Sequence, residues 1–259
     1  MKIECSDNLP FMKKIKSNTI DLIYCDILYG TGNNFDYYKD LQPIKQDIDN
    51  HYIPRINEMH RILKDTGSIY LQMDTYISHW IRLIMDDIFG YNNFRNEIIW
   101  KYISGGISKK YFARKHDNIL FYTKSKKYTF IIQKENRKNI NYCDGEDEKG
   151  EYIWYIKPNT NSKVPNGVKS YNESYITDVW NIPIINPQAK ERCGYPTQKP
   201  LELIERIIKS SSNENDLVAD FYLGSGTTAI ACKKLNRNFI GCDINKEAID
   251  IANKRLNKG

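Results

Sequence analysis

The sequence has no long hydrophobic run and no cysteine spacing typical of a metal site. No apolar stretch approaches the ~20 residues that a membrane-spanning helix needs, and residues 1–7 contain no apolar signal segment. None of the six cysteines forms a C-x-x-C pair, and the four histidines are scattered. We therefore expect a cytoplasmic protein with reduced thiols, no membrane span, no zinc or other metal site and no disulfide framework.

The composition is that of an ordinary globular protein, with 41% hydrophobic and 27% charged residues among 259. Its net charge is +6, and the excess positive charge is confined to the middle of the chain. Residues 101–200 hold 18 Lys and Arg against 10 Asp and Glu, a balance of +8, whereas the remainder has a balance of −2. This distribution indicates either a polyanionic partner, most often nucleic acid, or a solvated basic surface.

Strand-like and helix-like segments alternate along most of the chain. Residues 22–26 form a short apolar run that ends in Asp26, as in a buried parallel strand. The run 47–63 has one apolar helical face, and Pro54 within it should kink or split that helix. The alternation predicts an α/β fold in which a mostly parallel sheet has helices on both faces. Further strands are expected at 68–73, 97–102, 118–122, 217–219 and 238–242, and further helices at 76–89, from 201, at 227–235 and after Asn245 as N-cap.

Residues 125–195 differ from this pattern. They are rich in Lys, Asn, Tyr and Gly, and they contain only short strand-like pieces such as 128–132 and 152–156. We expect an irregular basic insertion without a large core, after which the regular α/β pattern returns near Pro200.

The strongest local motif is the run from Asp220 to Thr228, which lies between a predicted strand and a predicted helix. Gly224 and Gly226 allow a tight turn and close approach of a ligand, and the helix N-terminus beside them offers free N–H groups. Asp243 follows at the end of the next strand, where a carboxylate can accept hydrogen bonds from ribose hydroxyls. These features predict a nucleoside-cofactor site. A dehydrogenase is less well supported, because only 33 residues follow Gly226.

Three motifs in a fixed order carry a more specific resemblance. They are D-I-L-Y at 26–29, T-Q-K-P at 197–200 and F-Y-L-G-S-G at 221–226. In this order, the chain resembles the β-class, circularly permuted DNA amino-methyltransferases, which use S-adenosylmethionine and carry D-P-P-Y where this chain has D-I-L-Y. The resemblance implies a Rossmann-like methyltransferase sheet. It divides the chain into a catalytic half at 1–124, a target-recognition insertion at 125–195 and a cofactor-binding half of the same core at 196–259.

The resemblance implies N6 methylation of an adenine that is flipped out of double-stranded DNA. The Asp26 carboxylate and the Ile27 backbone carbonyl would accept hydrogen bonds from the amino group, and Tyr29 would stack on the base. In the permuted order, the segment Lys2–Cys5 supplies a further strand and brings Asp7 near the cofactor adenine, where Asp7 can also cap the next helix. The implied cofactor-binding residues are Asp7, Thr197, Lys199, Asp220, Phe221, Gly224, Gly226, Thr227 and Asp243.

The expected DNA contacts lie in the basic middle region. Residues 114–118 resemble the family segment that helps to hold the flipped base, although a solvated turn explains them equally well. A homodimer and a cognate restriction enzyme are further partners that the resemblance implies. The DNA-binding residues that we expect are Lys109, Lys110, Arg114, Lys115, His116 and Lys126.

Two alternatives to adenine methylation stay open. Cytosine-N4 methylation uses the same chemistry, although the family more often has serine in place of Asp26 there. A methylase fold that only binds DNA is the other alternative, because Ile27 and Leu28 replace two prolines that would stiffen the loop. Both residues add a backbone N–H that needs a partner, and we expect an active enzyme whose loop is held by the surrounding packing.

Overall fold

The computed structural model divides the chain into two compact units, one formed by residues 1–131 and 178–259 and the other by residues 132–177. The smaller unit lies within the range that the sequence predicts for the insertion, and residues 178–195 belong to the larger unit. The structure describes residues 1–33, 40–103, 106–136, 145–148, 150–156, 167–171 and 173–258.

The larger unit is built on an eight-stranded sheet with the order β1-β13-β12-β2-β3-β5-β4-β11. Only β5 runs antiparallel to its neighbours, so the predicted mostly parallel sheet is confirmed. The strands are β1 (Lys2–Cys5), β2 (Ile20–Asp26), β3 (Leu63–Met73), β4 (Phe94–Lys101), β5 (His116–Thr123), β11 (Val179–Asn181), β12 (Leu217–Asp220) and β13 (Asn238–Asp243).

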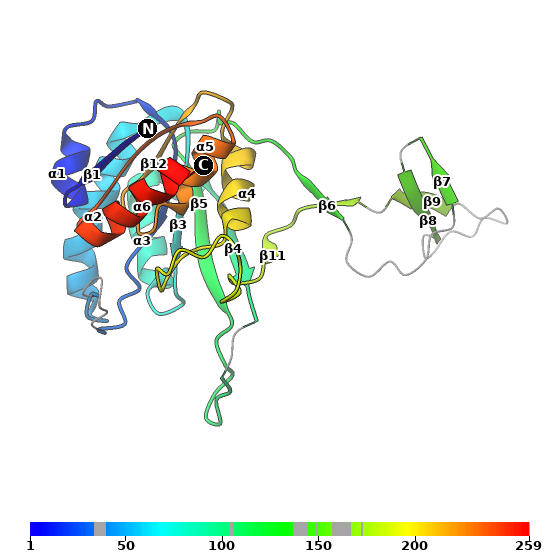
Figure 1. The fold of residues 1–259 in the computed structure, drawn as a ribbon, viewed down its shortest axis with the longest axis horizontal. Coiled ribbons are helices and arrows are strands. Elements are labelled where there is room, and N and C mark those ends of the chain that lie inside the picture. The colour runs from blue at the N-terminus through cyan, green and yellow to red at the C-terminus, as the bar shows by residue number, and fades with distance from the viewer. Residues whose placement is uncertain are drawn as a thin grey trace. The chain divides into compact units, whose positions relative to one another are not determined.

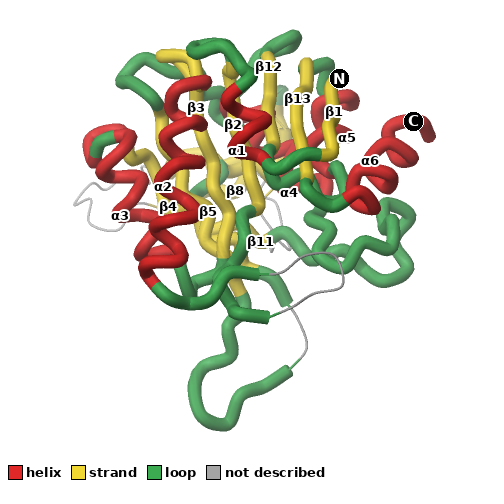
Figure 2. Tube along the Cα trace, turned by 90° about the vertical axis from the view of Figure 1, so that its left-hand side faces the viewer, coloured by secondary structure: helices red, strands yellow, loops and turns green. Residues whose placement is uncertain are grey.

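Helices cover both faces of this sheet (Figures 1 and 2). One group packs α1 on α2 and α2 on α3, and the other packs α4 on α5 and α5 on α6. None of the described helices is long and apolar enough to cross a membrane. The helices are α1 (Asn8–Lys13), α2 (Lys45–Ile62), α3 (Ser78–Phe89), α4 (Leu201–Ser211), α5 (Thr227–Lys234) and α6 (Lys246–Lys258), with a 3₁₀ turn η1 (Tyr91–Asn93).

The central strand β2 shows why the sequence folds in this way. The consecutive residues from Leu22 to Cys25 are at most 1% exposed, as expected for a parallel strand that is covered on both faces. In contrast, of the two effects expected for Pro54, a kink or a split, the split is wrong, because α2 runs from Lys45 to Ile62 with Pro54 inside it. The buried face formed by Ile48, Tyr52, Ile56, Met59 and Ile62 holds the helix together across the missing hydrogen bond.

The two ends of the chain meet in the sheet. Strand β1 pairs in parallel with β13, in a register that sets Cys5 opposite Asp243, and this confirms the strand predicted at Lys2–Cys5. Asn245 caps α6, since its side-chain oxygen accepts hydrogen bonds from the N–H groups of Glu247 and Ala248. The first strand of the chain therefore lies next to the last one.

The smaller unit consists of short antiparallel strands. Strand β6 (Lys134–Asn136) pairs with β10 (Glu173–Tyr175), and β8 (Gly150–Ile156) lies between β7 (Gly145–Asp147) and β9 (Gly167–Tyr171). The strand-like piece at 152–156 is thus confirmed, whereas 128–132 is not a strand. The rings of Tyr128 and Phe130 pack instead against Phe121 of β5.

Candidate active site

The carboxyl ends of β2, β12 and β13 open into one cavity of about 390 Å³. These strands end in Asp26, Asp220 and Asp243, and all three side chains line the cavity. Ligands of open α/β sheets bind at this edge, because the loops that follow parallel strands diverge there. All the predicted catalytic and cofactor residues line the cavity except Gly226.

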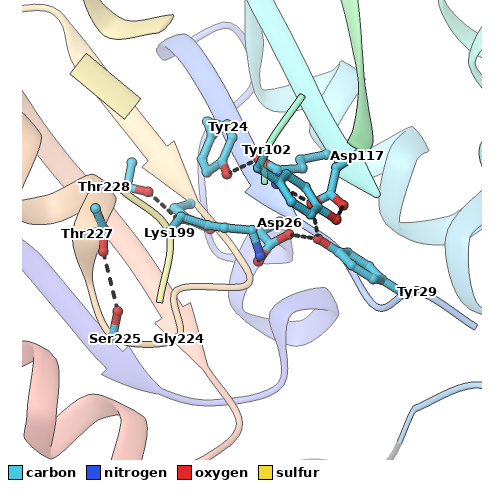
Figure 3. A network of polar contacts seen from close by, with 12 residues as sticks. Tyr24, Asp26, Tyr29, Tyr102, Asp117, Lys199, Gly224, Ser225, Thr227 and Thr228 are labelled. Atoms are coloured by element: carbon cyan, nitrogen blue, oxygen red, sulfur yellow. Dashed lines mark hydrogen bonds and ion pairs between the residues drawn. The ribbon is translucent and has the colours of Figure 1, made fainter. Parts of the chain in front are cut away.

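Asp26 lies in the cavity wall between a cation and a phenol (Figure 3). The Lys199 ammonium is 2.5 Å from its Oδ2 atom, and the Tyr29 hydroxyl is 2.9 Å from its Oδ1 atom. Burial raises the pKa of Asp26, and the neighbouring Lys199 opposes that shift. Lys199, which the sequence assigns to the cofactor, thus lies against the predicted catalytic carboxylate.

A second carboxylate, Asp117 at the start of β5, shares Tyr29 with Asp26. The Tyr29 hydroxyl is 2.8 Å from Asp117 Oδ2, and this carboxylate also accepts hydrogen bonds from Tyr102 and Gln72. Asp117 is only 4% exposed. A phenol donates a single proton, so the Tyr29 hydroxyl can donate to only one of the two carboxylates at a time. Burial raises the pKa of Tyr29, which keeps it a donor.

Sequence reasoning missed the part that Asp117, Tyr102 and Gln72 have in this network. The sequence marks only Asp117, because it belongs to the segment 114–118 that resembles the family segment for the flipped base; no pattern marks Tyr102 or Gln72. Gln72 also accepts a hydrogen bond from the buried Tyr24 at 2.7 Å, so the network continues into the sheet.

The glycine loop is held by Asp243. The Gly224 N–H donates to Asp243 Oδ2 at 2.8 Å, and the Asn245 N–H donates to its Oδ1 at 2.9 Å. Gly224 and Gly226 both have positive φ angles, of 50° and 79°. A Cβ atom on Gly226 would lie 2.6 Å from the Cβ of Ala252, so this glycine is required by the packing of α5 on α6.

Comparisons with known proteins show the family to which the chain belongs. The family model of the N6/N4 DNA methylases matches residues 20–254. The chain belongs to this DNA methylase family. It is 33% identical to the type II methyltransferase M.HpaI of Haemophilus parainfluenzae, and the match covers 98% of this chain and 74% of that protein. It is also 33% identical to the DNA adenine methyltransferase YhdJ of Escherichia coli K12, and that match covers 96% of this chain and 80% of that protein.

Solved methyltransferase structures share the fold of this methylase. The complex of M1.HpyAVI with S-adenosylmethionine superposes with a TM-score of 0.60 at 22% identity, and covers 99% of this chain and 98% of that one. The cytosine-N4-specific PvuII DNA methyltransferase gives a TM-score of 0.64 at 14% identity, with coverages of 99% and 93%. The predicted methyltransferase fold is therefore confirmed.

The D-I-L-Y loop of the methylase is held by its surroundings. The Ile27 N–H donates to the Gln72 carbonyl at 3.0 Å, and the Tyr52 hydroxyl donates to the Leu28 carbonyl at 2.7 Å. The Ile27 side chain is 3% exposed and belongs to the hydrophobic core, against which Leu28 also packs. Packing and hydrogen bonds thus fix the backbone where two prolines would otherwise restrict it.

The other end of the cavity is polar. The Asp7 carboxylate caps α1 by accepting from the Leu9 N–H, and it pairs with Arg55 at 3.0 Å. The Arg55 guanidinium also donates to Asn8, whose amide donates to the Phe221 carbonyl. The cap predicted for Asp7 is confirmed. Arg55 and Asn8 line the cavity although no sequence motif marks them.

The predicted DNA-binding residues fall at two places in the methylase. Lys109, Lys110, Arg114 and Lys115 lie in the loop between β4 and β5, with His116 at its end. Lys126 follows the last residue of β5. Because β5 runs antiparallel to β3, this end of β5 lies at the edge of the sheet opposite to the edge that carries Asp26. The structure does not bring Lys126 together with the others. Within the described part of the chain, no group of three or more His, Cys, Asp or Glu could hold a metal ion.

Asp220 should make the stability of the methylase depend on pH. Burial raises its pKa to about 7 from an ordinary 3.8. Between pH 4 and 7 the unfolded chain therefore loses this proton before the folded one does, and the free energy of unfolding falls as the pH rises, by up to about 1.4 kcal/mol per pH unit. We expect Asp220→Asn, which cannot ionise, to gain stability relative to the wild type across this window. Urea unfolding of both proteins at pH 4.5, 6 and 7.5 measures the difference, and parallel curves would contradict it.

Proposed function

We propose that this methylase transfers a methyl group from S-adenosylmethionine to the exocyclic N6 of an adenine that is flipped out of double-stranded DNA. The observation that carries the proposal is one cavity shared by the Asp26 carboxylate, the Tyr29 ring and the glycine loop with Asp243. The names of two relatives support the proposal: M.HpaI is a type II methyltransferase, and YhdJ is a DNA adenine methyltransferase. A homodimer and a companion restriction enzyme stay predictions, as does target recognition by residues 125–195.

The cavity fits S-adenosylmethionine in size and in chemistry. A volume of about 390 Å³ is within the range of small-molecule sites. The Asp243 carboxylate accepts the N–H groups of Gly224 and Asn245, and its two oxygens retain capacity to accept from a ribose hydroxyl. Phe221, Leu223 and Ile244 supply apolar contacts for the adenine, and the Asp7 carboxylate, which the resemblance places near the adenine, pairs there with Arg55. When bound, the cofactor supplies an electrophilic methyl group on a sulfonium.

The chain's own residues have to prepare the amino nitrogen. Its lone pair is conjugated with the base, so acceptors that bind both amino hydrogens favour a localised lone pair. The Asp26 carboxylate has capacity for another donor beside Lys199 and Tyr29, and the Ile27 carbonyl lies next to it in the chain. The Tyr29 ring, fixed through its hydroxyl, provides the surface on which the base stacks. Catalysis then rests on positioning and electrostatics.

Transfer of labelled methyl groups to unmethylated genomic DNA tests the proposal. The DNA is digested to nucleosides, and the label is expected in N6-methyladenine. Label in N4-methylcytosine would assign the alternative base. Protein that binds both S-adenosylmethionine and DNA but leaves every base unmethylated would establish the DNA-binding alternative instead.

Asp243→Ala should weaken cofactor binding. The substitution removes the ribose acceptor and both hydrogen bonds that hold the loop at Gly224 and Asn245. Because hydrogen bonds to a charged group contribute about 1.5–3 kcal/mol each, we expect the dissociation constant for S-adenosylmethionine to rise on the order of 10- to 100-fold. Calorimetry measures it. Asp250→Ala, at an exposed ion pair with Lys246 on α6, is the matched control and should bind as the wild type does. Equal affinity in all three folded proteins would refute the assignment.

A further inference from the structure

The loop between β4 and β5 extends away from the sheet, and we call its outer part, residues 106–115, the tip (Figure 1). Phe112 is 99% exposed, the highest value for a large apolar side chain among the described residues, and Ile107 is 88% exposed. Tyr111 is also exposed. Three exposed large apolar side chains within ten residues cost free energy in water, which favours a partner that covers this tip.

The charge of the tip identifies the chemistry of that partner. The tip holds Lys109, Lys110, Arg114 and Lys115, and residues 102–116 contain no Asp or Glu. Arg114 lies over the rings of Tyr76 and Tyr111, at 4.2 Å and 5.3 Å from their centroids, and donates to the Tyr76 hydroxyl. Cations around an apolar centre match a surface with phosphates outside and stacked bases inside, which is the double helix.

The base of the loop is connected to the catalytic carboxylate. Lys101 and His116 are paired across β4 and β5, and the Tyr102 N–H donates to the Lys115 carbonyl at 3.1 Å. The Tyr102 hydroxyl donates to Asp117 at 2.9 Å, and Asp117 shares Tyr29 with Asp26 (Figure 3). The loop that carries the tip therefore starts and ends at the edge of the sheet where the target base has to arrive.

We propose that the 106–115 tip enters the double helix beside the target base and that Phe112 fills the space in the base stack that the flipped base leaves. This inference rests on the proposed function and adds to it the element that stabilises the flipped state. Unstacking and unpairing a base is unfavourable, and an inserted aromatic ring restores stacking with the neighbouring bases. The basic side chains of the tip bind phosphates whatever the state of the base.

The test compares two short duplexes that carry the adenine which the wild type methylates. One is fully paired, and the other has an abasic site opposite the target, which makes flipping less costly. For Phe112→Ala we expect kcat/KM to fall on the order of tenfold on the paired duplex, as loss of a stacking contact predicts, and to return close to the wild-type value on the abasic duplex. Phe112→Tyr, which keeps the ring, should match the wild type on both.

Two further variants distinguish stacking by Phe112 from a phosphate contact and from the loss of an exposed ring elsewhere on the protein. Lys110→Ala should lower the affinity for both duplexes by the same factor, because a phosphate contact does not depend on flipping. Tyr91→Ala removes a 70% exposed ring before β4, at the end away from the loop, and should change neither. Wild-type rates for Phe112→Ala on the paired duplex, or an equal loss on both duplexes, would overturn the inference. Wild-type protein that methylates no DNA would instead overturn the proposed function.

Discussion

Asp26→Asn is expected to slow methyl transfer on the order of 10²- to 10³-fold while the protein still binds S-adenosylmethionine. Asparagine keeps the size of the side chain but removes the charge, and its NH₂ group cannot accept a hydrogen bond from the target amine. It also leaves the ammonium of Lys199 without its carboxylate. Loss of one preorganised electrostatic contact costs on the order of 10²- to 10³-fold in rate, and we expect a loss of this size because asparagine keeps only one of the two acceptor oxygens. Single-turnover methylation of DNA measures the rate, and calorimetry measures cofactor binding.

Asp74→Asn provides the matched control for this experiment. Asp74 follows β3 at the same edge of the sheet, where its carboxylate accepts hydrogen bonds from Thr75 and Tyr76, but it does not line the cavity. We expect near wild-type transfer from this variant. A folded Asp26→Asn protein that methylates DNA at the wild-type rate would contradict the catalytic assignment of Asp26.

Lys199→Met is expected to shift the acid limb of the pH–rate profile to higher pH. Burial raises the pKa of Asp26 and the Lys199 ammonium lowers it, so without the ammonium the pKa of Asp26 rises further. Only the ionised Asp26 carboxylate can accept from both the Tyr29 hydroxyl and the target amino group. Below the pKa of Asp26, the active fraction of the enzyme falls about tenfold per pH unit. The variant should therefore begin to lose activity at a higher pH than the wild type does, and regain it when the buffer is made more alkaline.

Lys199→Arg and Lys209→Met are the controls for that profile. Arginine keeps a positive charge beside Asp26, so we expect the acid limb to stay near its wild-type position. Lys209 lies on the exposed side of α4 in a pair with Glu205, and its substitution should have no effect. A uniform fall in rate at every pH for Lys199→Met would mean that the lysine acts on the substrate and not through the titration of Asp26.

The amino-acid sequence by itself determined the α/β fold and the three motif positions. Apolar runs such as 22–25 indicate buried strands of a parallel sheet, because a strand that is apolar on both faces has to lie between two layers of helices. Gly224 and the aspartates at 26 and 243 could be placed in one site, since each lies at or after the end of a predicted strand and parallel strands end at a common edge.

Only the tertiary structure decided which side chains complete the site. Lys199 and Asp26 are 173 positions apart, and Tyr29 and Asp117 are 88 apart, so no local pattern connects them. The strand order sets β5 antiparallel beside β3, which brings Asp117 to the catalytic edge and carries Lys126 to the opposite end. Gly226 likewise owes its place to Ala252 of another helix. Hydrophobic periodicity reveals which face of an element is buried, but neighbours across a sheet are chosen by the packing of the whole chain.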